Sequence, residues 1–295
     1  MRKFFFCVSI FFVLVFLQSF ILPKNSNKSK RYNLSICAIF KNEGKYLKEW
    51  IEYHRLVGVD HFYLYNNNST DRSVDVLKPY IKQNLVTLIH WPDCLGKQSE
   101  EKAFIWALST QTSAYENAVQ LREKETKWLI FLDVDEFLTP VNDDSFYKIL
   151  EQYDEYPGVV LQTEFFDASI QDMPPKKNLV IQSLEMTQDP KTNIQKSVEK
   201  TIFKPDLCES FTWPPYKCVF KKKQKALKLD DHAIRINQYT NRNKGSLNSQ
   251  KRKNKISQIP TGANKKALLE AGYEIEDQEC LIQRFVPDLL KKMGY

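Results

Sequence analysis

The expected fold is decided by the stretch Lys127-Trp128-Leu129-Ile130-Phe131-Leu132-Asp133-Val134-Asp135-Glu136-Phe137. Residues 127–132 are largely apolar and have the length of a buried strand, and carboxylates follow immediately. Bringing carboxylates to the end of a buried strand costs free energy unless something cationic compensates them. The stretch therefore predicts a strand that ends at a charged binding site rather than on an ordinary surface loop.

Before this stretch, strand-like runs alternate with helix-like runs. Strands are expected over residues 34–40, 61–65 and 85–91, and helices over 46–58, from about residue 72, and over roughly 97–124. This alternation predicts an α/β fold with a mostly parallel, Rossmann-like sheet flanked by helices. In the first helix, apolar residues recur at helical spacing, which makes Trp50 a core residue, and Gly58 suits the C-terminal cap.

Polar residues follow two of these strands, at 66–71 and at the acidic stretch. Ligands of parallel α/β sheets bind outside the carboxyl ends of the strands, so both sets should open on the same rim. Asp71 fits a turn or helix-cap role and a ligand-binding role equally well. The same two interpretations apply to residues 40–44, which end the first strand.

Asp133 and Asp135 stand two residues apart, which on an extended strand end places both carboxylates on one face. Hard divalent cations bind through such oxygens, and they neutralise a departing nucleoside diphosphate in glycosyl transfer. An isolated pair of this spacing is common on solvated loops, but the preceding apolar strand favours a site. Glu136 is expected to point elsewhere, toward a backbone group or a basic partner.

Composition narrows the classes of function. The 295 residues carry a net charge of +7 with 42% hydrophobic residues, which excludes disorder of the whole chain and favours anionic partners. The basic runs at 217–228 and 242–255 have little of the aromatic interleaving that stacks bases, which weakens nucleic-acid binding. Without CxxC pairs a zinc ribbon is unsupported, and only Cys208 and Cys218 suit a disulfide.

The N-terminus carries an apolar run from Phe4 to Leu22 that is long enough to span a membrane. A cleaved signal peptide is the rival, but bulky residues follow the run where a cleavage site needs small ones, which favours an uncleaved single-pass signal anchor. The expected domains are an anchor at 1–23, a polar stalk at 24–33 and a catalytic domain at 34–295. The flanking basic residues weakly favour a cytoplasmic catalytic domain, and the compartment stays open between that and a Golgi lumen.

Blocks spread over most of residues 34–290 resemble glycosyltransferase family 92. In order, they are CAIFKNEGKYLKEWIEYHRLVGVDHFYLYNNNSTD, QTSAYENA, KWLIFLDVDEF, KTIFKP, IRINQYTNR and LIQRFVP. The resemblance implies a GT-A fold, a nucleotide-sugar donor of the UDP-sugar type, an inverting transfer that is often of galactose, and Mn²⁺ or a similar cation such as Mg²⁺.

The resemblance also implies roles for individual residues. It places the nucleotide at Asn42, Glu43 and Asp71, the donor near Gln111, the ribose and the metal at Asp133 and Asp135, and a phosphate within reach of Lys200. The chain departs from the family pattern at two positions. Asp167 follows Phe166 where the family usually has glycine, and Gln238 stands where it usually has histidine.

An inverting transfer needs a general base to deprotonate the acceptor hydroxyl, and a carboxylate is the usual choice. Asp167, Asp230 and Asp231 are candidates that the sequence does not rank, and each is more often a surface residue than a base. His232 is a lone histidine, which is more often structural than catalytic.

The sequence thus predicts a membrane-anchored, metal-dependent glycosyltransferase that acts on a glycan or another hydroxyl acceptor. A second hypothesis is a non-catalytic, membrane-anchored GT-A-like protein that binds anionic glycan, lipid or protein, which the altered motif positions make credible. A nucleic-acid-binding protein is the weakest alternative, because it rests on charge alone.

Overall fold

The computed structural model describes residues 29–92, 100–143, 145–167, 179–182, 198–212, 217–229, 233–240 and 282–295. The fold described below belongs to one compact unit, Arg31–Tyr295. The predicted membrane span at 4–22 lies outside the described residues, as do Asp230, Asp231 and His232. None of the helices in the described part is both long and apolar enough to cross a membrane.

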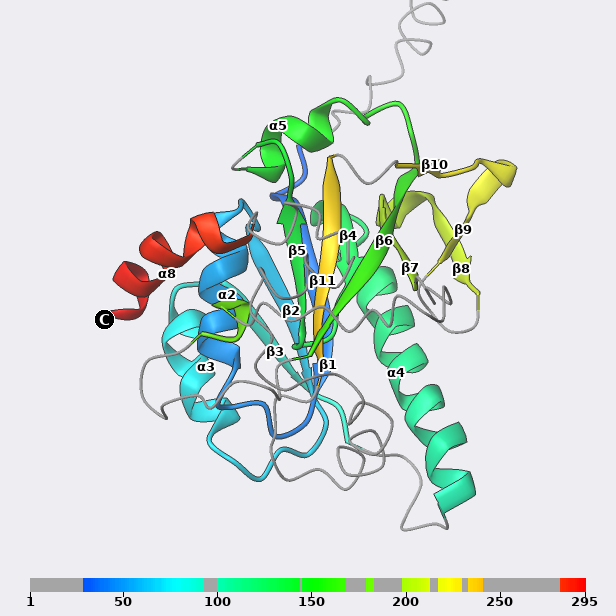
Figure 1. Cartoon of the computed structure of the whole chain (residues 1–295). Coiled ribbons are helices and arrows are strands. Elements are labelled where there is room, and N and C mark those ends of the chain that lie inside the picture. Colours follow the sequence, from blue (N-terminus) through cyan, green and yellow to red (C-terminus); the bar gives the residue numbers. More distant parts are fainter. Residues whose placement is uncertain are drawn as a thin grey trace, which may run out of the picture. The chain divides into compact units, whose positions relative to one another are not determined.

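The first half of the unit alternates strands and helices as the sequence predicts (Figure 1). Its elements are β1 Tyr32–Phe40, α2 Leu47–Leu56, β2 His61–Asn66, α3 Ser73–Lys82, β3 Val86–His90, α4 Glu100–Arg122, β4 Thr126–Phe131, β5 Glu136–Pro140 and α5 Phe146–Glu151. The later elements are β6 Gly158–Asp167, η1 Val180–Gln182, β7 Glu199–Phe203, η2 Pro205–Leu207, β8 Cys208–Phe211, β9 Cys218–Phe220, η3 Lys221–Lys223, β10 Leu227–Lys228, β11 Ile234–Thr240, η5 Ile282–Phe285 and α8 Val286–Met293. Gly58 follows α2 with φ +99°, which confirms its capping role.

The main sheet has the strand order β3-β2-β1-β4-β7-β6-β11-β5, with β10 beside β6. The strands from β3 to β4 are parallel. The second half is mixed, because β7 runs antiparallel to β4 and β6, and β11 runs parallel to β6 but antiparallel to β5. The predicted α/β class is confirmed. The parallel sheet is confirmed for the first half, whereas sequence reasoning did not order the strands after Gly158.

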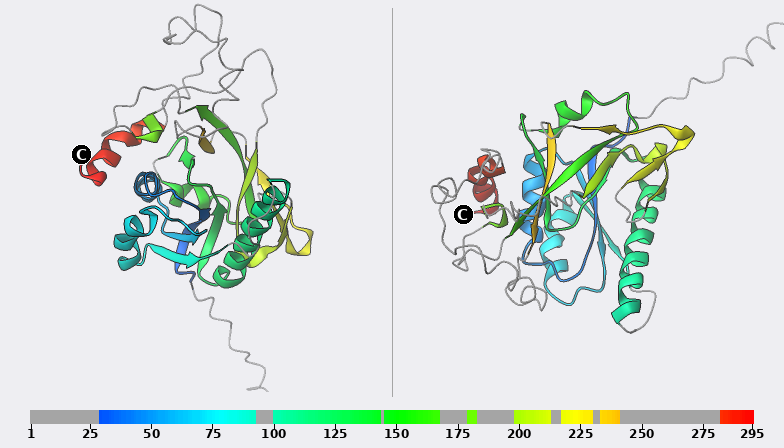
Figure 2. Two further views of the ribbon diagram at one scale, coloured as in Figure 1. Left: turned by 90° about the horizontal axis from the view of Figure 1, so that it is seen from below. Right: turned by 45° about the vertical axis from the view of Figure 1, so that its right-hand side comes forward.

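Hydrophobic side chains cover both faces of the sheet. In β4, Trp128 and Ile130 face the core beneath α2 and α3, whereas Leu129 and Phe131 face the core beneath α4. This is the alternation that a strand buried on both sides requires. Figure 2 shows α4 on one side of the sheet and the pair α2 and α3 on the other. Cys208 and Cys218, the pair that the sequence left open as disulfide partners, form a disulfide that joins β8 to β9.

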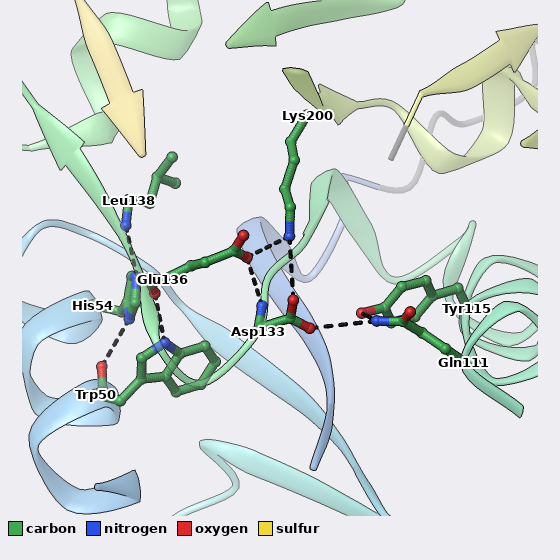
Figure 3. Close-up of polar contacts among 8 residues, drawn as sticks. All are labelled: Trp50, His54, Gln111, Tyr115, Asp133, Glu136, Leu138 and Lys200. Carbon is green, nitrogen blue, oxygen red and sulfur yellow. Dashed lines mark hydrogen bonds and ion pairs between the residues drawn. The ribbon is translucent and has the colours of Figure 1, made fainter. Parts of the chain in front are cut away.

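Strand β5 ends the sheet, and side chains of α2 bind its free edge (Figure 3). The indole N–H of Trp50 donates to the carbonyl of Glu136 at 2.8 Å. The N–H of Leu138 donates to Nε2 of His54 at 3.1 Å, and Nδ1 of His54 lies 2.8 Å from the carbonyl of Trp50. His54 is therefore neutral with its proton on Nδ1. Trp50 is fully buried, which confirms its predicted core role, and it also ties β5 to α2.

Burial lowers the pKa of His54 from 6.5 to about 3, although its contact with the carbonyl of Trp50 acts in the opposite direction. Below pH 6.5 the unfolded chain takes up a proton that the folded protein excludes. The stability contributed by neutral His54 is therefore complete above pH 6.5, and it is lost as the pH falls toward 3. The loss should be at most about 1.4 kcal/mol per pH unit.

We expect His54→Gln to be less stable than the parent at pH 7 but to lose less stability between pH 6.5 and about 5. Urea unfolding at each pH measures this difference in slope. His90→Gln is the matched control, because His90 is exposed at the end of β3, and it should keep the parental slope. Equal slopes for the parent and His54→Gln would show that His54 does not carry this pH dependence.

Candidate active site

The acidic residues lie in a turn between β4 and β5 rather than on an extended strand end. The N–H of Glu136 donates to the carbonyl of Asp133 at 3.0 Å, which closes the turn. The N–H of Tyr239 donates to the carbonyl of Asp135 at 2.8 Å, which ties the turn to β11. The expectation that strand alternation aligns the two carboxylates is therefore wrong, because the backbone turns between them. We call residues 133–135 the acidic turn.

Both aspartates nevertheless line the same cavity, which has a volume of about 240 Å³. It lies between the end of β1 and the acidic turn, and its walls are Ile39, Phe40, Lys41, Glu43, Asp133, Val134 and Asp135. The carboxylates of Glu43, Asp133 and Asp135 give it an acidic wall, and Lys41 adds a cation. Such a wall suits a hard cation together with an anionic ligand.

Gln111 reaches the acidic turn from α4. Its Nε2 lies 3.3 Å from Oδ1 of Asp133 and 3.1 Å from the hydroxyl of Tyr115. Tyr115 is fixed in turn, because its ring stacks on Phe131 at 4.0 Å between centroids. The amide of Gln111 is thus held by the helix while it binds one oxygen of Asp133. The structure therefore brings Gln111 to the predicted donor region.

Glu136 and Lys200 form a buried ion pair beneath the turn (Figure 3). Oε2 of Glu136 also accepts the N–H of Asp133 at 2.7 Å. The expected partners of Glu136, a backbone group and a basic side chain, are therefore confirmed, but its carboxylate lies beside Asp133 and shares Lys200 with it. Burial raises the pKa of Glu136, whereas Lys200 acts in the opposite direction. Nζ of Lys200 lies 3.8 Å from Oδ2 of Asp133.

The loops after β1 and β2 are bound to each other. Oδ1 of Asn42 accepts the N–H groups of Thr70 at 2.7 Å and Asp71 at 3.3 Å. The carboxylate of Asp71 accepts the N–H of Gly44 at 2.9 Å and that of Ser73 at 3.0 Å. Burial raises the pKa of Asp71, but these hydrogen bonds, together with one from the Ser73 hydroxyl, outweigh it and lower the pKa.

Asn42 and Asp71 therefore hold the rim of the cavity together. The bond from Ser73 to Asp71 agrees with the turn role left open for Asp71, whereas its bond from Gly44 in the other loop was not predicted. Asn42 has φ +59°, a backbone conformation that asparagine tolerates better than most residues. Glu43 lies between these contacts, and its carboxylate lines the cavity wall. Of the three residues that the resemblance assigns to the nucleotide, Glu43 is the one that lines the cavity.

Gln238 lies in β11 directly opposite Glu136 of β5. Directly opposite residues of an antiparallel pair project from the same face, so Gln238 shares the face of the Glu136–Lys200 pair. Asp167 ends β6 and pairs with Thr240, one position beyond the Tyr239 that binds the acidic turn. The other proposed bases, Asp230 and Asp231, lie outside the described residues.

The residues present fit a divalent cation. Among the described residues, no group of three or more His, Cys, Asp or Glu side chains forms a metal cluster. Magnesium-type sites commonly use one or two carboxylates and complete their coordination with substrate phosphates and water. Asp133 and Asp135 can supply such a partial set at the cavity wall.

Sequence reasoning missed two features of the site. Lys41 lines the cavity but was not singled out, although it directly follows the end of β1 and its position was readable. The ties from Trp50 and His54 to β5 were not readable, because their spacing indicates only a buried helix face. No local pattern shows that their ring nitrogens bind a strand far along the chain.

Comparison with known proteins identifies a matching family model and similar relatives. The family model for glycosyltransferase family 92 matches residues 30–268. A glycosyltransferase family 92 protein of Oryza sativa subsp. japonica is 28% identical over 133 residues, which are 45% of this chain and 20% of that protein. A galactan β-1,4-galactosyltransferase of Arabidopsis thaliana is 29% identical over 149 residues, 48% of this chain and 28% of that protein.

These matches span only 20% and 28% of the length of the two relatives. Among solved structures, TarS of S. aureus, residues 1–349 in complex with UDP, aligns with a TM-score of 0.39 and 14% identity. That alignment covers 70% of this chain and 60% of TarS.

Gly44 offers a test of the bound loops. A Cβ added there would lie 2.8 Å from the backbone nitrogen of Ser73 and 3.1 Å from the carbonyl carbon of Arg72. We expect Gly44→Ala to push the two loops apart and to lower the unfolding free energy by about 1–3 kcal/mol. Hydrogen exchange should then speed up at residues 42–44 and 70–73.

Thr70→Ser is the control, because it keeps the hydroxyl that donates to Oδ1 of Asn42 at 3.4 Å and removes only a methyl group from an exposed side chain of the same loop. Exchange in Thr70→Ser should match that of the parent. Unchanged exchange in Gly44→Ala would mean that the loops tolerate separation, and that their hydrogen bonds do not hold the rim together.

Proposed function

Because the chain belongs to glycosyltransferase family 92, we propose that it is a glycosyltransferase that moves a sugar from a nucleotide-sugar donor to a hydroxyl of a glycan or glycoconjugate. The donor is a UDP-sugar, the fold is of the GT-A type, the reaction depends on Mn²⁺ or a similar cation, and it inverts the anomeric centre. The single observation that carries the proposal is the cavity at the carboxyl ends of β1 and β4, lined by Asp133 and Asp135.

The residues at this cavity would have different roles in binding the donor. Asp135, with help from Asp133, would hold the cation, which when bound neutralises the charge that develops on the leaving diphosphate. Gln111 orients Asp133, and the other carboxylate oxygen of Asp133 can accept a hydrogen bond from a ribose hydroxyl. Lys41 adds a positive charge to the wall beside the diphosphate.

An inverting transfer also requires a base on the acceptor side. Asp167, Asp230 and Asp231 remain the proposed candidates. Asp167 ends β6, whose neighbour β11 binds the acidic turn through Tyr239, so this strand end belongs to the same half of the sheet as the turn. Galactose is the first sugar to test, because one relative is a galactan β-1,4-galactosyltransferase.

The proposal is tested by a donor screen that measures release of nucleoside diphosphate from a panel of nucleotide sugars with Mn²⁺. Mn²⁺-dependent release from a UDP-sugar, increased by a hydroxyl acceptor, would support a transferase. Binding without release from any donor would instead favour the non-catalytic alternative. Lack of both binding and release across the panel would overturn the proposed function.

The metal role of Asp135 gives a sharper prediction. We expect Asp135→Asn to weaken Mn²⁺-dependent UDP-sugar binding at least tenfold, because removal of one negative ligand weakens a hard-cation site. The melting temperature should hardly change, since the side chain is partly exposed. Calorimetry of UDP-sugar binding, with and without a chelator, measures the effect.

Asp75→Asn is the matched control, because Asp75 is an exposed aspartate of α3 that pairs with Lys78 on the surface. It should bind donor as the parent does. The metal role of Asp135 would be excluded if Asp135→Asn and the parent had equal donor affinity. It would also be excluded if the chelator left the donor affinity of the parent unchanged.

Gln238 provides a test of the altered family position. A glutamine offers a carbonyl oxygen or an N–H but no positive charge, whereas histidine can ligate a metal or donate to a phosphate when protonated. We expect Gln238→His to keep the fold and to tighten Mn²⁺-dependent donor binding or raise turnover. A Mn²⁺ titration against UDP-sugar measures this. An unchanged titration would exclude Gln238 from the active site.

A further inference from the structure

Glu136 and Lys200 are charged side chains in the protein interior, where burying a charge costs free energy. Each side chain is about 2% exposed, and the two form an ion pair. A buried pair of this kind stabilises little in itself, because desolvation offsets the attraction between the charges. Removing one partner is far more harmful, since it leaves a lone buried charge. The Glu136–Lys200 pair is therefore better explained by the residues that it positions than by a contribution to the free energy of unfolding.

The pair holds Asp133. The backbone N–H of Asp133 donates to Oε2 of Glu136 at 2.7 Å, and its Oδ2 lies 3.8 Å from Nζ of Lys200. Its other carboxylate oxygen, Oδ1, accepts from Gln111 at 3.3 Å. The backbone nitrogen and both carboxylate oxygens of Asp133 thus each face a group that comes from a different element: β5, β7 and α4 (Figure 3).

Lys200 is poorly placed to bind a phosphate directly. The residue is 1% exposed, and its ammonium group already faces the carboxylates of Glu136 and Asp133. It is not among the residues that line the cavity. To reach a diphosphate there, Lys200 would have to leave Glu136 with an uncompensated buried charge.

We propose that the Glu136–Lys200 pair positions the donor site. Lys200 neutralises Glu136 and fixes the carboxylate of Asp133, while Glu136 fixes the backbone of the acidic turn. Lys200 is a positioning residue rather than a ligand of the donor diphosphate. This inference rests on the proposed function, because it assigns Asp133 to the ribose and to the cation of a nucleotide donor.

The two roles of Lys200 predict different results with uridine, which has no phosphate. A phosphate ligand contributes to UDP binding but not to uridine binding. A residue that positions Asp133 contributes to both, because both ligands carry the ribose. The experiment therefore measures dissociation constants for UDP and for uridine at saturating Mn²⁺, on folded protein below its melting temperature.

The variants are Lys200→Met, Glu136→Gln and the double variant, with Lys204→Met as the matched control. Lys204 lies in the same segment, but it contacts Asp154 and the ring of Trp128 instead of the acidic turn. We expect Lys200→Met to weaken binding of both UDP and uridine about ten- to hundredfold. Lys204→Met should bind both ligands as the parent does.

The double variant covers the case in which Lys200→Met does not fold. It removes both charges, so no lone buried charge remains, and the protein should fold. We expect it to bind both ligands more weakly than the parent but no more weakly than either single variant, because the two residues act as one unit.

Each contrary outcome has a distinct meaning. A loss confined to UDP, with uridine binding unchanged, would identify Lys200 as a phosphate ligand and overturn the inference. Parental affinity for both ligands in Lys200→Met, or in the double variant if the single does not fold, would also overturn it. A parent that binds no UDP with Mn²⁺ would overturn the proposed UDP-sugar donor, and the inference with it.

Discussion

The structure depends on compensating the negative charge of the carboxylates that follow a buried strand at one rim of the sheet. Glu136 is buried immediately after the acidic turn, and its charge is tolerable only because Lys200 of β7 meets it there. The place of β7 between β4 and β6 meets this requirement. The strand that carries the compensating lysine must pass directly beside the strand that leads into the acidic turn.

A second constraint comes from the edge of the sheet. β5 ends the order of the described strands, so its outer N–H and C=O groups have no neighbouring strand among them. Trp50 and His54 of α2 bind two of these groups, at Glu136 and Leu138. The helix therefore does more than bury an apolar face. It fixes the start of β5, and this in turn fixes the side of the sheet on which the Glu136 carboxylate meets Lys200.

These ties also mark the limit of what the sequence could predict. The alternation of strands and helices through β4, the shared rim, the burial of Trp50 and the kinds of partner that Glu136 binds all follow from local patterns, and all agree with the structure. The turn at Asp133 could not be predicted from alternation, because β5 pairs with β11, about a hundred residues later. The burial of Lys200 could not be predicted either, because the residues that surround it are distant in the sequence.

The two sides of the cavity are built differently, and this difference bears on how a nucleotide can be bound. The acidic turn is fixed by buried groups from β5, β7, β11 and α4. The opposite rim is formed by two loops whose exposed hydrogen bonds join Asn42 to the Thr70–Asp71 backbone and Asp71 to Gly44. Exposed hydrogen bonds open at lower cost than buried ion pairs. The side of the acidic turn is thus preorganised, and adjustment to a bound ligand falls on the loop side.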